Sequence, residues 1–149
     1  MDVLTYLSKA VSASFMGFFP LFEIYLAVPA ALAMRLDYVS AVVWPVLGNF
    51  LVVPLVIFFS GQLKRIKFVR RWLARPGSER WEAALERYGV FFVLLMTPIL
   101  GVWLMTALAQ TAGMKPFRLM VAALLSISLY GVIIAMGVGL GLDWFTSQE

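Results

Sequence analysis

The segment VSAVVWPVLGNFLVVPLVIFFS, from Val39 to Ser60, contains 22 residues and no charged side chain. At a rise of about 1.5 Å per residue it forms a helix of about 33 Å, which is enough to cross a hydrocarbon core of about 30 Å. The segment from Phe117 to Leu142 has the same character after Arg118. Its four glycines are typical of close helix contacts in membranes; they are Gly131, Gly137, Gly139 and Gly141. The sequence therefore predicts two transmembrane helices, at 39–60 and 117–142.

The composition of the whole chain agrees with a membrane protein. Of its 149 residues, 62% are hydrophobic and 13% are charged, whereas soluble domains are about 45–50% apolar and about 25% charged. A water-soluble fold of this size cannot bury so much apolar surface. The chain has no cysteine and no histidine, which removes thiolate metal sites and the commonest general base. We therefore expect no metal, no cofactor and no enzymatic activity.

Two further apolar segments are interrupted by helix-breaking residues. The segment Ala10–Met34 contains Pro20, Glu23 and Pro29. The segment 90–112 contains Pro98 and Gly101. Proline removes a backbone hydrogen bond, and in lipid the freed carbonyl needs a partner from protein or water. Each segment is thus predicted to be a re-entrant hairpin, and four simple spans with proline kinks are the alternative.

The order of broken segment, span, linker, broken segment and span indicates an internal repeat. Pro20 and Pro98 are 78 positions apart, and the same shift carries the first span into the second. If each hairpin returns to the side it entered, the two hairpins open from opposite faces. That is the inverted repeat of many secondary transporters. We predict an all-α polytopic membrane protein with one transmembrane domain over residues 1–149.

The linker at 61–89 holds eight of the twelve basic residues, so the positive-inside rule places it in the cytoplasm and the protein in the bacterial cytoplasmic (inner) membrane. Its apolar residues recur at helical spacing, as in basic amphipathic helices that lie on anionic lipid. Arg70, Arg71 and Trp72 are the expected membrane-surface residues. Both termini lie outside in the hairpin topology and inside in the four-span topology, and the charge distribution fits both.

Glu23 is the one ionisable side chain deep inside an apolar segment. A carboxylate in a bilayer either binds a proton or faces water and a cation, so Glu23 is the candidate ion-coupling residue. A protonated Glu23 that caps the backbone freed by Pro20 is the structural alternative. Asn49 follows Gly48, which permits a close approach of hairpin backbone, and Asn49 either hydrogen-bonds that backbone or joins helices. The candidate substrate-binding residues are Asn49, Thr106, Tyr25, Thr97 and Gln110.

The run Pro20-Leu-Phe-Glu23-Ile-Tyr25-Leu-Ala27-Val28-Pro29 resembles the P-x-x-E-x-R-G-A-I-P element of the small multidrug export protein family, a relative of the DedA (SNARE-associated/VTT) membrane proteins. Three further sequence motifs follow in the family's order; they are Gly48-Asn49 with Pro54, Glu86-Arg87-Tyr88-Gly89, and Pro98-x-x-Gly101 with Thr106. The resemblance implies two opposed re-entrant hairpins and a role in transport or lipid translocation. The family's Arg-Gly pair is replaced by Tyr25-Leu26, so its charge pairing cannot be assigned to Glu23.

These observations predict a small secondary transporter or exporter, coupled to protons or cations, with its substrate site near the bilayer midplane between the hairpins. Pro20, Pro29, Pro98 and Gly101 are the predicted helix breaks. Two alternatives remain open, a translocase for lipid or polyprenyl phosphate of DedA type and a non-transporting subunit of a larger membrane complex. We expect membrane lipids, a small-molecule or lipid substrate and a homodimer or larger assembly as partners, and no nucleic acid.

Overall fold

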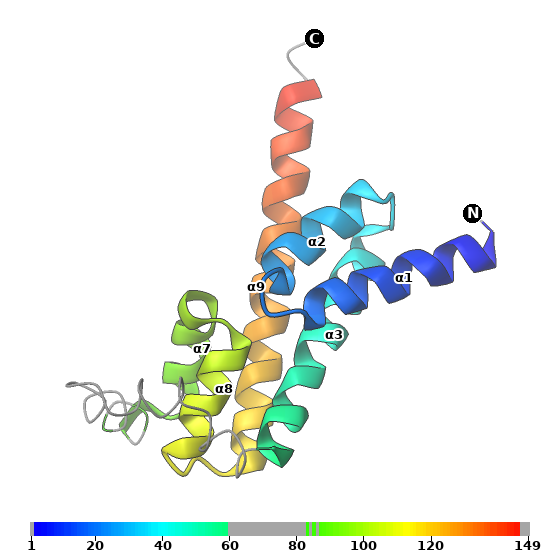
Figure 1. Cartoon of the computed structure of the whole chain (residues 1–149). Helices are drawn as coiled ribbons and strands as arrows, with labels where there is room; N and C mark the ends of the chain where they lie inside the picture. Colours follow the sequence, from blue (N-terminus) through cyan, green and yellow to red (C-terminus); the bar gives the residue numbers. More distant parts are fainter. Residues whose placement is uncertain (1, 60–82, 84, 86, 147–149) are drawn as a thin grey trace. The chain divides into compact units, whose positions relative to one another are not determined.

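The computed structural model describes residues 2–59, 83, 85 and 87–146. All regular structure in these ranges is helical (Figure 1). The helices are α1 (Val3–Phe18), α2 (Glu23–Ala33), α3 (Tyr38–Phe58), α7 (Val90–Leu100), α8 (Val102–Thr111) and α9 (Pro116–Thr146). The prediction of an all-α fold is therefore confirmed for the described part of the chain.

Helices α3 and α9 coincide with the two predicted spans. Both are long and apolar enough to cross a membrane, over 21 residues in Tyr38–Phe58 and 26 residues in Pro116–Gly141. The start of α3 is set by Asp37, whose Oδ1 accepts a hydrogen bond of 3.0 Å from the Ser40 backbone N–H. A carboxylate at this position satisfies an N–H group that has no partner within the helix.

The two interrupted segments each form a pair of short helices. Helix α1 contacts α2, and α7 contacts α8. Helix α1 begins at Val3, seven residues before the expected start of the first broken segment at Ala10. The reason is that a helix requires only backbone hydrogen bonds, so polar side chains such as Lys9 do not prevent it from extending beyond the apolar run.

The breaks follow the expected residues only in part. Pro20 lies between α1 and α2, and Gly101 lies between α7 and α8. Pro29, by contrast, lies inside α2, and Pro98 lies inside α7. The expected breaks at Pro29 and Pro98 therefore do not occur. Proline is tolerated inside helices of membrane proteins where another group satisfies the carbonyl that loses its N–H partner.

Backbone conformations with positive φ occur at the ends of the short helices. Among the described residues they are Glu23 (φ 44°), Arg35 (φ 61°), Gly89 (φ 48°), Gly101 (φ 78°) and Gly113 (φ 82°). Glu23 and Gly101 are 78 residues apart, and so are Arg35 and Gly113. Two non-glycine residues thus hold a conformation that costs about 1–2 kcal/mol for an L-amino acid.

The chain divides into two compact units. The first unit comprises residues 1–49 and 127–149, and the second comprises residues 50–126. Each unit therefore contains one pair of short helices and one part of each long helix. The first unit has an apolar cluster of Ala13, Ala31, Leu36 and Ala41, packed against partly buried side chains that include Tyr6 and Trp44.

Candidate functional site

Glu23 is the first residue of α2, directly after the turn that follows α1. Helix α1 ends at Phe18 and Pro20 lies in the turn that follows, where a proline cannot continue the helix. The Glu23 backbone N–H donates to the Phe19 carbonyl at 3.0 Å. The Glu23 residue is only 7% exposed. The structure thus combines a buried acid and a strained backbone at one residue, and both features concentrate at functional sites.

The Tyr25 side chain lies near this acid in the first unit. Tyr25 interacts electrostatically with Glu23 and with Tyr130 of α9. Tyr25 is 37% exposed, so one side of this group is accessible from outside the protein. Tyrosine hydroxyls can donate to a carboxylate or accept from a protonated one. Sequence reasoning missed Tyr130, because a tyrosine 105 residues after Tyr25 on a separate apolar segment has no local signal that links the two.

The backbones of α1 and α3 are in close contact beside Asn49. A Cβ atom added at Gly48 would collide with the Ser14 carbonyl oxygen, and one at Gly17 would collide with the Pro45 carbonyl oxygen. The Ser14 hydroxyl also donates to the Trp44 carbonyl oxygen at 3.0 Å. Gly48 therefore permits the backbone approach that its position in the sequence predicts. Such contacts between glycines and backbone are typical of helix interfaces in membranes.

Asn49 is 1% exposed, and its Oδ1 atom has no hydrogen-bond donor among the described residues. This oxygen therefore accepts no hydrogen bond from the hairpin backbone in the described part of the chain, and the expected role of Asn49 in binding that backbone stays a prediction. A buried oxygen without a donor costs about 1–3 kcal/mol. Such an atom requires an explanation, and a bound water or a ligand donor is a common one.

In the second helix pair, a side chain outside the helix satisfies the carbonyl that loses its N–H partner at Pro98. Pro98 has no N–H to donate to the Leu94 carbonyl, one turn earlier in α7. The Ser126 hydroxyl of α9 donates to this carbonyl at 3.0 Å. Ser126 is 0% exposed. A side chain on a distant helix thus replaces the missing bond, which explains why α7 continues through Pro98 and ends only at Gly101.

The polar candidates of the second unit have different environments. The Thr97 hydroxyl donates to the Val93 carbonyl of its own helix at 2.6 Å, so its proton is already engaged. Thr106 is buried in α8, within a run of buried residues from Met105 to Ala109. The Gln110 Oε1 atom is buried and has no donor among the described residues. Gln110 is therefore the second side chain, after Asn49, whose oxygen is left for another donor.

The predicted ion-coupling residue and the five predicted substrate-binding residues are distributed over both units. Glu23, Tyr25 and Asn49 belong to the first unit, and Thr97, Thr106 and Gln110 belong to the second. A common site near the midplane for all six stays a prediction. The expected membrane-surface residues Arg70, Arg71 and Trp72 lie outside the described residues.

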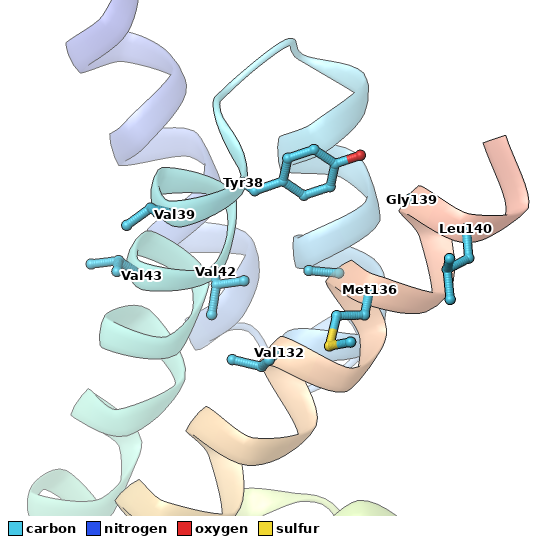
Figure 2. Close-up of a pocket in the computed structure, with 9 residues that line it drawn as sticks. Tyr38, Val39, Val42, Val43, Val132, Met136, Gly139 and Leu140 are labelled. Carbon is cyan, nitrogen blue, oxygen red and sulfur yellow. The ribbon is translucent and has the colours of Figure 1, made fainter. Parts of the chain in front are cut away.

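An apolar groove of about 660 Å³ lies in the first unit between the start of α3 and the second half of α9 (Figure 2). Val39, Val42 and Val43 line one side, and Val132 and Met136 line the other (Figure 2). The Tyr38 ring closes one end, and its hydroxyl is 2.9 Å from the position of a Cβ atom on Gly139. The groove fits an apolar group and contains no acid, so it is separate in character from the Glu23 site.

The comparisons with known proteins identify the family. A family model described as "Putative small multi-drug export protein" matches residues 23–133, a range that begins at Glu23 and includes α2, α3, α7, α8 and the first half of α9. The chain belongs to this family. With α3 and α9 long enough to span a bilayer, this small multi-drug export family member is a membrane protein of the transporter type. A search of curated proteins and a search of solved structures each found no match.

Proposed function

We propose that this member of the small multi-drug export family is a secondary transporter that exports a small molecule and uses Glu23 to exchange a proton or cation. The observation that carries the proposal is the burial of Glu23 at the break between α1 and α2, in a left-handed backbone conformation. A buried carboxylate is costly in its charged form. Access of water or a cation to Glu23 therefore favours its charged state and loss of that access favours its protonated state, which is the property that ion coupling needs.

The short helices support a re-entrant arrangement. Helices α2 and α7 have 11 residues each and α8 has 10 residues, which corresponds to about 15–17 Å of helix and about half of a hydrocarbon core. None of them can cross a bilayer alone. In this proposal each pair enters and leaves the membrane on the same side, and its break lies near the midplane.

The helix boundaries support an internal repeat. A shift of 78 residues carries Tyr38, the first residue of α3, to Pro116, the first residue of α9. The same shift carries Ala33 at the end of α2 to Thr111 at the end of α8, and it relates the two pairs of positive-φ residues. We infer two inverted repeats, with the linker in the cytoplasm of a bacterium, both termini outside and the protein in the inner membrane.

Within this repeat the two breaks are chemically different. The residue that corresponds to Glu23 is Gly101, so only the first repeat carries an acid at its break. One protomer thus supplies one coupling site. The orphan oxygens of Asn49 and Gln110 and the buried hydroxyl of Thr106 are the proposed donors and acceptors for substrate, with Tyr25 at the accessible side of the acid. A second copy of the chain is proposed to complete the wall of the pathway.

The lipid-translocating alternative requires a cation that can hold a phosphate inside the membrane. Helices α2, α7 and α8 contain no lysine or arginine. This absence favours transport of a small molecule coupled to Glu23 over translocation of a lipid phosphate through the same breaks. A non-transporting role as a subunit of a larger complex has no observation in its favour.

Reconstituted proteoliposomes test the coupling role. Liposomes loaded with the pH indicator pyranine report proton flux when a lipophilic cation such as ethidium is added on one side. We expect ethidium-dependent proton flux with the wild-type chain and its loss in Glu23→Gln, which keeps the shape of the side chain. Asp37→Asn removes an exposed carboxylate and is expected to keep the flux. Unchanged flux in Glu23→Gln would disprove the coupling role.

A further inference from the structure

A second cavity, of about 410 Å³, lies in the second unit at the start of α9. Its lining residues are Leu85, Gly89, Val90, Arg118 and the turn from Ala112 to Lys115. Its wall therefore combines apolar residues with two cationic ones. Neither cation has an ion-pair partner among the described residues, and Glu86, the acid nearest to the cavity in the sequence, lies outside them.

The equivalent helix start in the first repeat carries its own anion. There the Asp37 carboxylate accepts the Ser40 N–H at 3.0 Å and satisfies the start of α3. A shift of 78 residues places Lys115 at the position of Asp37 and Arg118 at the position of Ser40. The start of α9 thus carries two cations at the positions where α3 has Asp37 and Ser40. The start of a helix favours an anion, and an anion bound there would lie next to both cations.

The location of the cavity identifies the source of that anion. The cavity lies where a helix long enough to span the membrane begins, and its wall includes the end of the linker at 61–89. Lipid phosphates lie at this depth. Exposed apolar side chains continue from the cavity along α9 at helical spacing; they are Phe117, Val121, Leu124 and Leu125. This apolar row provides a surface for acyl chains directly next to the cations.

We propose that the cavity at the start of α9 binds the phosphate headgroup of an anionic phospholipid, with Lys115 and Arg118 as its ligands and the row from Phe117 to Leu125 against the acyl chains. This site is independent of the coupling role of Glu23. In the topology proposed above, the bound lipid belongs to the cytoplasmic leaflet and fixes the second repeat at that surface.

Native mass spectrometry of the full chain in detergent tests the proposal, with phosphatidylglycerol and phosphatidylcholine as probes. We expect the wild-type protein to prefer phosphatidylglycerol. The apparent affinity should fall about fivefold for each cation removed in Lys115→Gln and Arg118→Gln. The control Arg35→Gln, which removes an exposed cation of the first unit, should keep the wild-type preference.

Two further variants separate the cavity from net charge and from misfolding. Ala112→Phe fills the cavity and keeps both cations, and it should also weaken phosphatidylglycerol binding. The double variant Lys115→Arg with Arg118→Lys keeps both charges and should bind as the wild type does. An unchanged preference in the Lys115→Gln, Arg118→Gln double variant would overturn the proposal. It would also be overturned if glycerol 3-phosphate, which lacks acyl chains, bound as strongly as phosphatidylglycerol.

Discussion

The hydrogen bond from Ser126 to the Leu94 carbonyl allows a direct test of how α7 tolerates its proline. In Ser126→Ala the carbonyl loses its donor, and Pro98 cannot replace it. Loss of a buried hydrogen bond costs about 1–3 kcal/mol in soluble proteins, whereas double-mutant cycles in a membrane protein average about 0.6 and reach about 1.7 kcal/mol. Because Ser126 is fully buried and Pro98 has no N–H to donate to this carbonyl, we expect a loss of about 1 kcal/mol in the free energy of unfolding.

A double-mutant cycle distinguishes this mechanism from simple loss of packing. In Pro98→Ala the residue at position 98 regains an N–H and can donate to Leu94 within the helix. Ser126→Ala should then cost little, so the coupling energy between the two substitutions is expected to be about 1 kcal/mol. The assay is reversible unfolding in mixed micelles, followed by circular dichroism. Ser128→Ala is the matched control on the same helix and should change stability by less than about 0.5 kcal/mol.

The cycle has a clear negative outcome. If Ser126→Ala destabilises the wild-type chain and the Pro98→Ala variant by the same amount, the hydroxyl does not compensate for the proline. The account of why α7 continues to Gly101 is then wrong.

Three further predictions concern the first unit. Gly48→Ala should destabilise the chain by about 2–3 kcal/mol, because the added Cβ atom collides with the Ser14 backbone. The added Cβ atom of Gly137→Ala has no neighbour within 4 Å, so this variant should be neutral or stabilising in the same unfolding assay. The free energy of unfolding should be about 1 kcal/mol higher for Glu23→Gly than for Glu23→Ala, because only glycine adopts a φ of 44° without strain. Equal free energies of unfolding would argue against strain. The hydrogen bonds from the Ser40 side chain and backbone lower the pKa of Asp37 below its ordinary value of 3.8. The stabilisation by the Asp37 carboxylate is therefore fully present above pH 3.8 and is lost as the pH falls through the lowered pKa. This acid-dependent loss of stability should disappear in Asp37→Asn.

The long helices could be predicted from the sequence because their signal is local. An apolar run without charges indicates a spanning helix, and α3 and α9 begin within one residue of the predicted spans, although α9 continues to Thr146, four residues beyond the predicted end. The break after Phe18 was predictable for the same reason, since Pro20 acts on its own helix. The burial of Glu23 agrees with the expectation that a lone acid in an apolar segment lies inside the protein.

The remaining features depend on residues that are distant in the sequence. Pro98 was a reasonable break on local grounds, and it fails as one because Ser126, 28 residues later, supplies the missing donor. The contact between Gly48 and the Ser14 backbone could be anticipated in kind but not in its partner. Tyr130 interacts with Tyr25 only through the packing of the first unit. No pattern along the chain encodes these pairings.

The central claim is that the two repeats have opposite orientations in the membrane. The chain has no cysteine, so a single cysteine introduced at position 2 or at position 148 can be labelled in intact bacterial cells without background. The inverted arrangement predicts that a membrane-impermeant maleimide labels both positions from outside. Labelling of both positions only after the cells are opened would place both termini in the cytoplasm, and that result would contradict the account.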